Sequence, residues 1–524
     1  MILLKQIKSR SIEHQFYRWM SVEVSAKISK SNDELRETSK FDQEWLQAKD
    51  FKEIPGPSTF KLLSHYLPGG KLHNSNLIDF YKLLRDEYGD ISLIKGIMGK
   101  PNVVFTYNPA DIEKVYRTEG IWPIRVGLET FTYYRKKVRP DVFKNIGGLV
   151  SEQGKAWADI RNKVNPIMMK VQTVRENLPD IDDISQQFLQ KIEQLRDPKT
   201  KNIKTNFHDE VKLWAFESIC CIGLNKRMGF LNSSGSVDPD ALKLSDAMSR
   251  FFQLSFEFDV QPSIWKYYET PKFKTLIQTY DEITEITTKY INEAIANFGK
   301  GAGPTGVLEK LCCIDKQIAV VMAIDMLMAG MDTTSSVFLS TLYMIAKHPE
   351  KQNTLRREVM GILPDKNTPL TNENTKNMPY LRACIKEALR ITPITPANFR
   401  LTGCDVVLSN YRVPKGTGVS MGMMPLTNSD VYFPQSSEFM PERWLKSGEG
   451  ACPHAKGTNP FVYLPFGFGP RTCIGKRIAE MEMETLMTRL IRNYKISWYG
   501  DDLKYTSNII LIPAGDMRFK FEPI

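Results

Sequence analysis

Apolar residues recur at helical spacing along most of the chain, and this pattern predicts a mainly helical protein. The segments with this spacing span residues 76–90, 110–118, 176–196, 207–224, 240–256 and 272–298. Short strand-like runs, at residues 90–94 and 103–105, lie between the first two of them. The expected fold is therefore mainly α with a small β-rich region.

The longest predicted helix runs from Asp315, a good N-cap, toward Lys347, where His348-Pro349 ends it. Its first half is almost wholly apolar, so we expect it to cross the middle of the protein. That middle contains Ala329-Gly330-Met331-Asp332-Thr333-Thr334. A glycine in a helix interior costs about 1 kcal/mol relative to alanine, and Thr333 can hydrogen-bond to a backbone carbonyl. The segment is either a kinked buried helix or a space for a small ligand, with an acid beside an alcohol as its proton path.

Another helix is predicted over residues 476–494, where Ala479, Met483, Leu486 and Leu490 form an apolar stripe. A turn rich in glycine and proline, residues 465–475, precedes this helix and contains Cys473. The partial positive charge and free N–H groups of a helix N-terminus favour a thiolate. Most lone cysteines are simply buried, but this turn has the form expected of one that presents sulfur to a metal.

Composition restricts the function more than the fold. The chain has 524 residues, of which 42% are hydrophobic and 25% charged, as in an ordinary globular protein of one or two domains. The net charge of +10 favours acidic partners or phospholipid. A nucleic-acid partner is not expected, because no zinc-finger spacing or RNA-binding signature is present. The cysteines show no metal-ligand spacing and predict a reducing compartment; they stand at positions 220, 221, 312, 313, 384, 404, 452 and 473.

Residues 1–50 are predicted to precede the folded domain, which would span residues 51–524. The first 30 residues carry six basic side chains against Glu13 and Glu23. Their opening apolar run, residues 1–4, is far shorter than the roughly 20 apolar residues of a membrane span. This composition is typical either of a mitochondrial transit peptide or of a disordered basic tail.

The pattern Phe466-x-x-Gly469-x-Arg471-x-Cys473-x-Gly475 resembles the haem-binding loop of the cytochrome P450 family. The resemblance covers nearly the whole chain from about Pro55. It implies that the Cys473 thiolate is the metal ligand of haem b, and that Phe466 and Gly475 belong to the cofactor-binding residues. It also implies that Arg471 pairs with a haem propionate, because a guanidinium suits a carboxylate.

Further motifs match the family in chain order. By this resemblance Trp157 and Arg161, one helical turn apart, contact a haem propionate, as does Arg400. Alone, the first pair could equally be an exposed cation stacked on an aromatic ring. Asp332 and Thr333 match the acid–threonine pair that takes part in oxygen activation and proton relay.

The C-terminal part of the chain matches the family's scaffold and its electron-transfer surface. Glu387, Arg390 and Arg443 resemble the buried charged triad that holds the haem loop, although an i, i+3 pair is usually a weak surface salt bridge. By the resemblance, basic residues in this part of the chain dock an acidic two-iron two-sulfur ferredoxin. Without the resemblance, the same residues would be interpreted as an ordinary solvated basic face. The residues of this predicted docking face are Arg382, Lys386, Lys476 and Arg477.

Substrate residues are expected from the same resemblance. The predicted set is Phe251, Phe252, Met322, Met326, Ala329, Phe399 and Ile510. The aromatic-rich connection at 256–268 is either ordinary core and rim, or a substrate entrance that dips into a membrane surface. Residues 133–140 could form no more than a basic surface loop. Together with residues 147–150 they resemble the region before the C helix in insect mitochondrial-type members, and this resemblance of residues 133–150 favours the detoxifying branch.

The resemblance implies a haem-thiolate monooxygenase on the matrix side of the mitochondrial inner membrane, held there peripherally. Electrons would come from NADPH through ferredoxin reductase and ferredoxin, and one oxygen atom of O2 would enter a lipophilic substrate. Xenobiotic detoxification is favoured, and a hydroxylase that makes ecdysteroid or other steroid hormones is the alternative. Two further alternatives are an O2-independent haem-thiolate isomerase or dehydratase, and a haem protein that only senses or stores.

Overall fold

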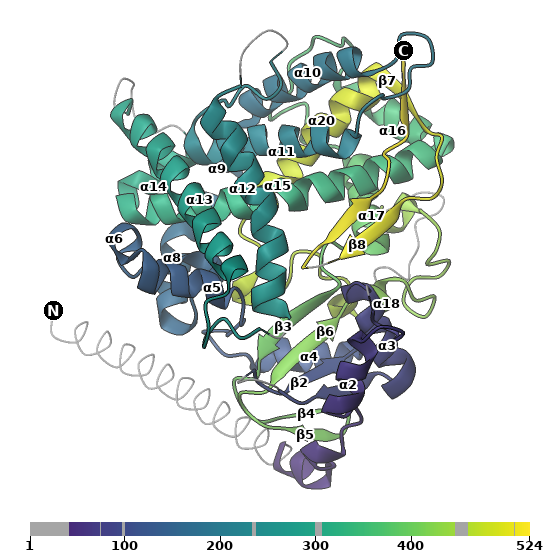
Figure 1. Cartoon of the computed structure of the whole chain (residues 1–524). Helices are drawn as coiled ribbons and strands as arrows, with labels where there is room; N and C mark the ends of the chain where they lie inside the picture. The colour runs from purple at the N-terminus through teal and green to yellow at the C-terminus, as the bar shows by residue number, and fades with distance from the viewer. Residues whose placement is uncertain are drawn as a thin grey trace, which may run out of the picture.

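The structure, a computed structural model, describes residues 41–73, 75–96, 100–232, 237–261, 263–298, 306–445, 459–507 and 509–524. Helices make up most of this part of the chain and surround α15 (Lys316–Lys347), which crosses the middle of the molecule (Figure 1). The predicted mainly helical fold with a small β-rich region is therefore confirmed. Most of the predicted N-terminal segment, residues 1–40, lies outside the described residues.

The helices are short near the start of the described chain and longer beyond residue 150. Before α15 they are α2 (Thr59–Tyr66), α3 (Leu77–Tyr88), α4 (Pro109–Thr118), α5 (Glu129–Tyr133), α6 (Pro140–Phe143), α7 (Gly148–Ser151), α8 (Gly154–Met168), α9 (Val171–Arg175), α10 (Leu178–Leu195), α11 (Phe207–Leu224), α12 (Pro239–Ser255), α13 (Pro271–Ala296) and α14 (Gly306–Ile314). After it come α16 (Pro349–Ile362), α17 (Pro379–Ile391), α18 (Met424–Thr427) and α20 (Lys476–Asn493). Single turns of 3-10 helix are η1 (Phe51–Glu53), η4 (Pro441–Trp444), η5 (Pro460–Val462) and η6 (Gly469–Arg471), and turns of π-helix are η2 (Tyr134–Val138) and η3 (Phe256–Val260). The long predicted helices thus lie where the apolar spacing placed them.

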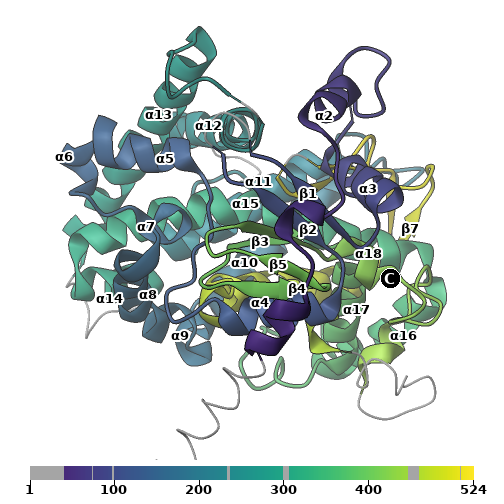
Figure 2. The same ribbon diagram turned by 90° about the horizontal axis from the view of Figure 1, so that it is seen from below.

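The strands lie mainly to one side of the helical body (Figures 1 and 2). They are β1 (Ile91–Ile94), β2 (Val103–Thr106), β3 (Ala397–Leu401), β4 (Val406–Leu408), β5 (Tyr411–Val413), β6 (Gly418–Gly422), β7 (Tyr494–Trp498), β8 (Lys504–Ser507), β9 (Leu511–Ala514) and β10 (Phe519–Pro523). One sheet has the order β1-β2-β6-β3, with β2 and β6 parallel and the other neighbours antiparallel. The pairs β10-β7, β4-β5 and β8-β9 form two-stranded sheets. This topology joins strands that are about 300 residues apart in sequence, which local spacing could not predict.

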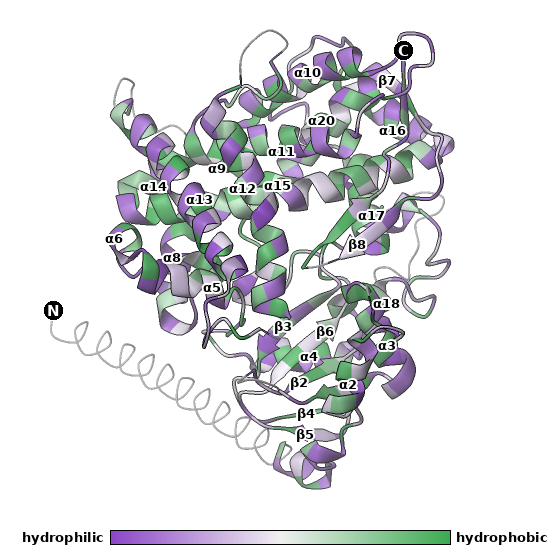
Figure 3. Ribbon diagram, viewed as in Figure 1, coloured by the Kyte–Doolittle hydropathy of each residue, from purple (hydrophilic) through white to green (hydrophobic). Residues whose placement is uncertain are grey.

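The sequence signals at the two ends of α15 act as predicted. The Asp315 side chain accepts hydrogen bonds from the N–H groups of Gln317 and Ile318, and the helix ends at Lys347, before His348-Pro349. Within the described residues, α15 is the one helix long and apolar enough to cross a membrane, and 83% of its most apolar 18-residue stretch is buried in the protein. It is a core helix, whereas α12 and α13 alternate between hydrophobic and hydrophilic positions (Figure 3).

Gly330 has a packing reason that the sequence did not reveal. A Cβ atom added at Gly330 would lie 2.7 Å from Cγ1 of Ile219, on α11. The glycine therefore lets α11 and α15 approach closely, which offsets its low helix propensity. On this side of the helix Ile219 occupies the space, and the ligand space expected beside this residue stays a prediction.

Residues 133–138 are not a basic surface loop. Tyr134 and Arg135 are fully buried in the π-helical turn η2. Arg135 Nη2 lies 2.7 Å from Oδ1 of Asp325, the acid of the apolar half of α15, and its guanidinium lies 3.8 Å from the ring centroid of Phe131. Gly148, at a φ of 79°, leaves the room for this pair, since a Cβ there would lie 2.2 Å from Arg135. The segment before α8 is thereby tied to the central helix.

Candidate functional site

The turn that contains Cys473 is closed by its own backbone. The N–H of Cys473 donates to the carbonyl oxygen of Phe466 at 2.9 Å. Gly467 and Gly469 have φ values of 73° and 71°, in the left-handed region that favours glycine. Gly475, at a φ of −82°, is the N-cap of α20. The turn therefore holds the sulfur just before the N-terminus of this helix, as the sequence predicted.

Burial and the backbone act in opposite directions on the Cys473 thiol. Burial raises the pKa of this thiol above its ordinary value. The N–H groups of Gly475 and Lys476 and the cations Arg125 and Arg161 lower the same pKa. The stabilisation that we expected from the helix terminus is present, but it does not outweigh burial. A metal ion that coordinates the sulfur would deprotonate it.

Free surface inside the protein marks a place for a cofactor. The Cys473 side chain is exposed even though the protein surrounds it on most sides. On α15, Ala329 is exposed and Thr333 is partly exposed. Met328, just before Ala329, and Met331, between Ala329 and Thr333, are almost fully buried. Helix α20, which begins just after the cysteine, packs directly against α15. Exposed groups on two helical elements that pack against each other, Cys473 just before α20 and Ala329 on α15, fit a flat cofactor that the sulfur ligates.

Four guanidinium groups lie close to one another beside the same turn. They belong to Arg125, Arg161, Arg400 and Arg471. The carboxylate of Glu119 pairs with Arg400 and also interacts with Arg471. Burial, with the neighbouring cation Arg125, lowers the pKa of Arg161 to about 10 and that of Arg471 to about 9. So many buried cations are stable only with further anions close by. The two propionates of haem would supply them, so the residues present fit this group.

The predicted haem contacts come together around this turn, with one difference. The Arg471 guanidinium lies 3.9 Å from the ring centroid of Trp157, and Arg161 Nη2 donates to the carbonyl oxygen of Thr472 at 2.7 Å. Arg400 instead pairs with Glu119, with 2.5 Å between Nε and Oε2. A carboxylate that the sequence did not indicate therefore shares the guanidinium assigned to the propionate.

The acid and the alcohol of α15 face different surroundings. Thr333 Oγ1 donates to the carbonyl oxygen of Ala329 at 2.6 Å, as predicted for the helix interior. The Asp332 side chain is only 4% exposed, and Lys212 of α11 lies with Nζ 2.8 Å from its Oδ1. Lys212 is 20% exposed, so it joins the buried acid to the protein surface. His208, one turn earlier on α11, is close enough to interact with Asp332, and burial lowers its pKa.

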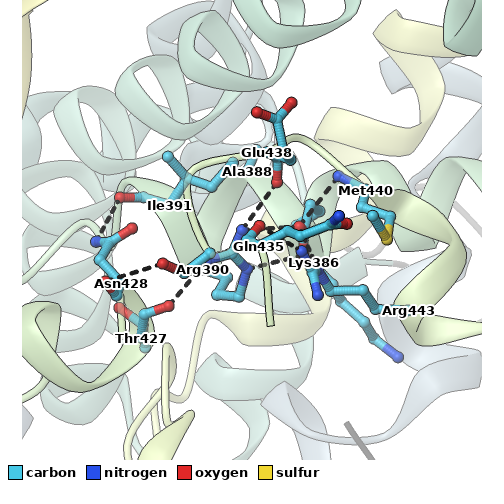
Figure 4. Close-up of polar contacts among 12 residues, drawn as sticks. Lys386, Ala388, Arg390, Ile391, Thr427, Asn428, Gln435, Glu438, Met440 and Arg443 are labelled. Carbon is cyan, nitrogen blue, oxygen red and sulfur yellow. Dashed lines mark hydrogen bonds and ion pairs between the residues drawn. The ribbon is translucent and has the colours of Figure 1, made fainter. Parts of the chain in front are cut away.

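The predicted charged triad is buried and complete. Glu387 accepts from Arg390 at 2.8 and 3.0 Å and from Arg443 at 3.0 Å, and these three side chains are 0–2% exposed. Glu387 also accepts from the indole of Trp444 at 2.8 Å. Arg390 donates to the carbonyl oxygens of Thr427 and Glu438, which joins α17 to the chain before the cysteine turn (Figure 4). The weak surface salt bridge considered above is therefore excluded.

The predicted substrate residues do not all present free surface. Ala329 is exposed and Phe252 and Phe399 are partly buried. Phe251 packs against Phe131 and Tyr280, with ring centroids 6.3 and 6.0 Å apart. Met322, Met326 and Ile510 are buried, and the Met326 methyl group lies against Gly223 of α11. Their role as substrate contacts stays a prediction.

The four basic residues of the predicted docking face line one hollow of about 620 Å³. It is lined by Arg175, Arg382, Lys386, Lys476 and Arg477, and by two acids, Glu480 and Glu484. Arg382 is tied to Glu484 at 2.8 Å and Arg477 to Glu480 at 3.4 Å, so only part of the positive charge is free. Phe466 and Gly467 of the cysteine turn form part of the wall, so this hollow lies directly behind that turn.

Sequence reasoning missed Arg125, Glu119 and Lys212. Each lies far in sequence from the group it faces: 281 residues separate Glu119 from Arg400. Nothing in the residues next to them distinguishes them from ordinary surface charges. These residues are recognised as parts of the site only from the groups that the fold brings next to them.

Comparison with known proteins agrees with this geometry. The family model described as Cytochrome P450 matches residues 54–521. The chain is 59% identical over 493 residues to "Probable cytochrome P450 12b2, mitochondrial" of Drosophila melanogaster, covering 93% of this chain and 92% of that protein. It is 60% identical over 481 residues to "Cytochrome P450 12b1, mitochondrial" of Drosophila acanthoptera (90% of each chain), and 45% identical over 497 residues to "Cytochrome P450 CYP12A2" of Musca domestica (92% of each). On these matches the chain belongs to the cytochrome P450 family of monooxygenases.

Proposed function

We propose that this protein is a mitochondrial haem-thiolate monooxygenase that hydroxylates or otherwise oxygenates a lipophilic small molecule. The single observation that carries the proposal is the exposed Cys473 sulfur inside the protein, in a glycine turn beside α15. Haem bound there would supply the activation of O2. Cys473 would be its thiolate ligand, and Trp157, Arg161 and Arg471 would hold its propionates.

The chain's own residues would bring protons to the reaction from the surface. Asp332 is buried and ion-paired with Lys212, and the Lys212 side chain is 20% exposed to solvent. Thr333, the next residue, borders the free surface of α15 with its hydroxyl hydrogen-bonded to the helix. We infer that protons pass from solvent past Lys212 to Asp332, and that Thr333 holds the final proton donor in place.

Electrons would enter behind the haem loop. The hollow there carries five basic side chains and two carboxylates, a net positive surface that suits an acidic ferredoxin. Charge steering of this kind is screened by salt, with a Debye length of about 10 Å at 0.1 M. Mitochondrial relatives and the basic N-terminal composition support placement in that organelle.

The connection at 256–268 is the segment that we expect to contact the membrane. In the connection at 256–268, Phe258 and Trp265 are buried, but Tyr267 and Tyr268 are 79% and 64% exposed. Exposed tyrosines suit the interface of a bilayer, so this segment is our candidate for peripheral contact with the inner membrane. For the substrate we favour xenobiotics over ecdysteroids, on the resemblance of residues 133–150 to the detoxifying branch.

The function is tested by reconstitution with NADPH, ferredoxin reductase and ferredoxin. We expect substrate consumption that requires NADPH, both partner proteins and O2, and that falls as salt is raised from about 0.05 to about 0.3 M. Ecdysteroid precursors and plant toxins or insecticides are compared as substrates. Turnover of a lipid hydroperoxide without reductant would favour the isomerase class, and haem binding without any turnover would favour a sensor.

Replacing Lys212 by methionine is expected to uncouple the reaction. The change leaves the Asp332 carboxylate buried without its counter-ion, so proton supply should slow. We expect about 10-fold less product per NADPH consumed, equivalent to ~1.4 kcal/mol, and a matching rise in hydrogen peroxide. The control is Lys243→Met, because Lys243 is 70% exposed and makes only a long contact, 3.8 Å, with the half-buried Asp240. Equal coupling in the Lys212 variant and the control would contradict the assignment.

A further inference from the structure

The connection between α12 and α13 is fastened to α5 through one buried carboxylate. Asp259, in the π-helical turn η3, accepts from the N–H of Thr130 at 2.8 Å and from its hydroxyl at 2.7 Å. Thr130 is fully buried, and its hydroxyl lies 2.9 Å from the hydroxyl of Tyr280 on α13. Three elements that are distant in sequence therefore meet at the Asp259 carboxylate.

Weaker contacts surround this point. The Tyr133 ring lies 5.5 Å from that of Trp265, which stacks on Phe273 with 5.2 Å between centroids. Glu129 pairs with Lys266 at 2.6 Å. In Figures 1 and 2, α5 lies beside the ends of α12 and α13 that this connection joins. Tyr133 and Glu129 thus link α5 with the connection, and the Trp265–Phe273 stack links the connection with α13.

Farther along, the connection is much less packed. Tyr267 and Tyr268 are 79% and 64% exposed, and Ile264 is 47% exposed. Directly under Asp259 and Thr130, however, lies the cluster of Phe131, Phe251 and Tyr280. Phe251 is a predicted substrate residue, so the carboxylate fastens the segment that covers the expected substrate space.

We propose that Asp259 and Thr130 form a latch, and that release of this latch limits the entry of substrate. The inference rests on the proposed function, because it concerns access to that site. Asp259 acts on the position of the connection and touches neither haem nor substrate. Asp259 itself lies in the π-helical turn η3, and a second π-helical turn, η2, directly follows α5. Such turns are rare and are frequent at functional sites.

The charge of Asp259 makes the latch sensitive to pH. Burial raises the pKa of Asp259 to about 6, against the lowering effect of its bonds to Thr130. The charged and titratable groups around it are Lys100, Glu129, Lys266, Glu257 and Tyr280. When the latch is open and Asp259 is solvated, its pKa returns to about 3.9. The closed state therefore binds the proton more strongly and is favoured as pH falls through 6.

This difference of about two pKa units corresponds to at most ~100-fold in the ratio of closed to open states. Above pH 6 the buried carboxylate is ionised and its desolvation favours opening. Ligand entry should therefore be faster at pH 7.5 than at pH 5.5. The direction is opposite to that of a latch held by an ion pair, which would open when its acid is protonated.

The test measures how fast ligands reach the haem of the full-length holoprotein. The probe is a lipophilic azole, whose binding to ferric haem shifts the Soret band in a stopped-flow instrument. Wild type should bind the azole several-fold faster at pH 7.5 than at pH 5.5. Asp259→Asn keeps the shape and stays neutral, so it should bind slowly at both pH values. Thr130→Val removes one hydrogen bond of the latch and should bind faster than wild type, most clearly at pH 5.5.

Glu257→Gln is the matched control, since Glu257 lies on the same turn but pairs outward with Lys272. It should keep the wild-type rates and pH profile. Wild-type rates of Asp259→Asn at both pH values would overturn the latch, whatever Thr130→Val does. Failure of every variant and the wild type to bind the azole would instead refute the haem site, so the two proposals fail separately.

Discussion

Serine at position 473 is expected to remove the red-shifted Soret band of the reduced, carbon-monoxide-treated protein and to reduce turnover to background. The reason is electronic, because a serine hydroxyl is not ionised near neutral pH and cannot give iron the electron density of a thiolate. The turn itself should survive, since its closing hydrogen bond uses the backbone N–H of residue 473. The measurement is the CO difference spectrum together with haem content.

Cys404→Ser is the control for this change. Cys404 is also an exposed free cysteine, but it lies outside the turn, near the carbonyl oxygen of Thr118. Its replacement should leave the band and the activity unchanged. If Cys473→Ser kept the red-shifted band, another residue would ligate the iron and the proposed site would be wrong.

Glutamine at position 387 is expected to destabilise the fold by about 3–5 kcal/mol. Glu387 is the only carboxylate of the triad and is fully buried with Arg390 and Arg443. The amide keeps the shape but leaves two buried guanidinium groups without a counter-ion. Because this triad joins α17 to the chain that precedes the haem loop, haem retention should fall as well. Urea unfolding followed by circular dichroism, with the haem content of the purified protein, measures both effects.

The matched control is Glu438→Gln. Glu438 lies in the same network but contributes only its backbone carbonyl oxygen to Arg390, and its side chain is exposed. This change should cost less than about 0.5 kcal/mol. Equal stability of the two variants would show that the charge of Glu387 is not needed to hold the loop.

The outlines of the helices and the cysteine turn were predictable because their signals are local. Asp315 and Pro349 determine the two ends of α15 within a few residues of themselves. The glycines of the turn and the start of α20 place the sulfur in the same way, and a match to a known family's loop then gives it a chemical meaning.

The surroundings of that sulfur could not be predicted, since they depend on pairs that are distant in sequence. Arg135 lies within what looked like a basic loop, yet it is buried against Asp325, 190 residues away. Gly330 lies against Ile219 of another helix, a close approach that the residues next to it in sequence do not reveal.

The sequence by itself determined which residue presents the sulfur, which helix crosses the core, and which acid and alcohol stand side by side on it. Only the tertiary structure decided that Lys212 pairs with that acid, that Glu119 shares Arg400, and that Asp259 fastens the connection above Phe251. The physical reason is that caps, turns and helical spacing act over a few residues. A buried charge, by contrast, is stabilised by whichever partner the fold brings within about 3 Å.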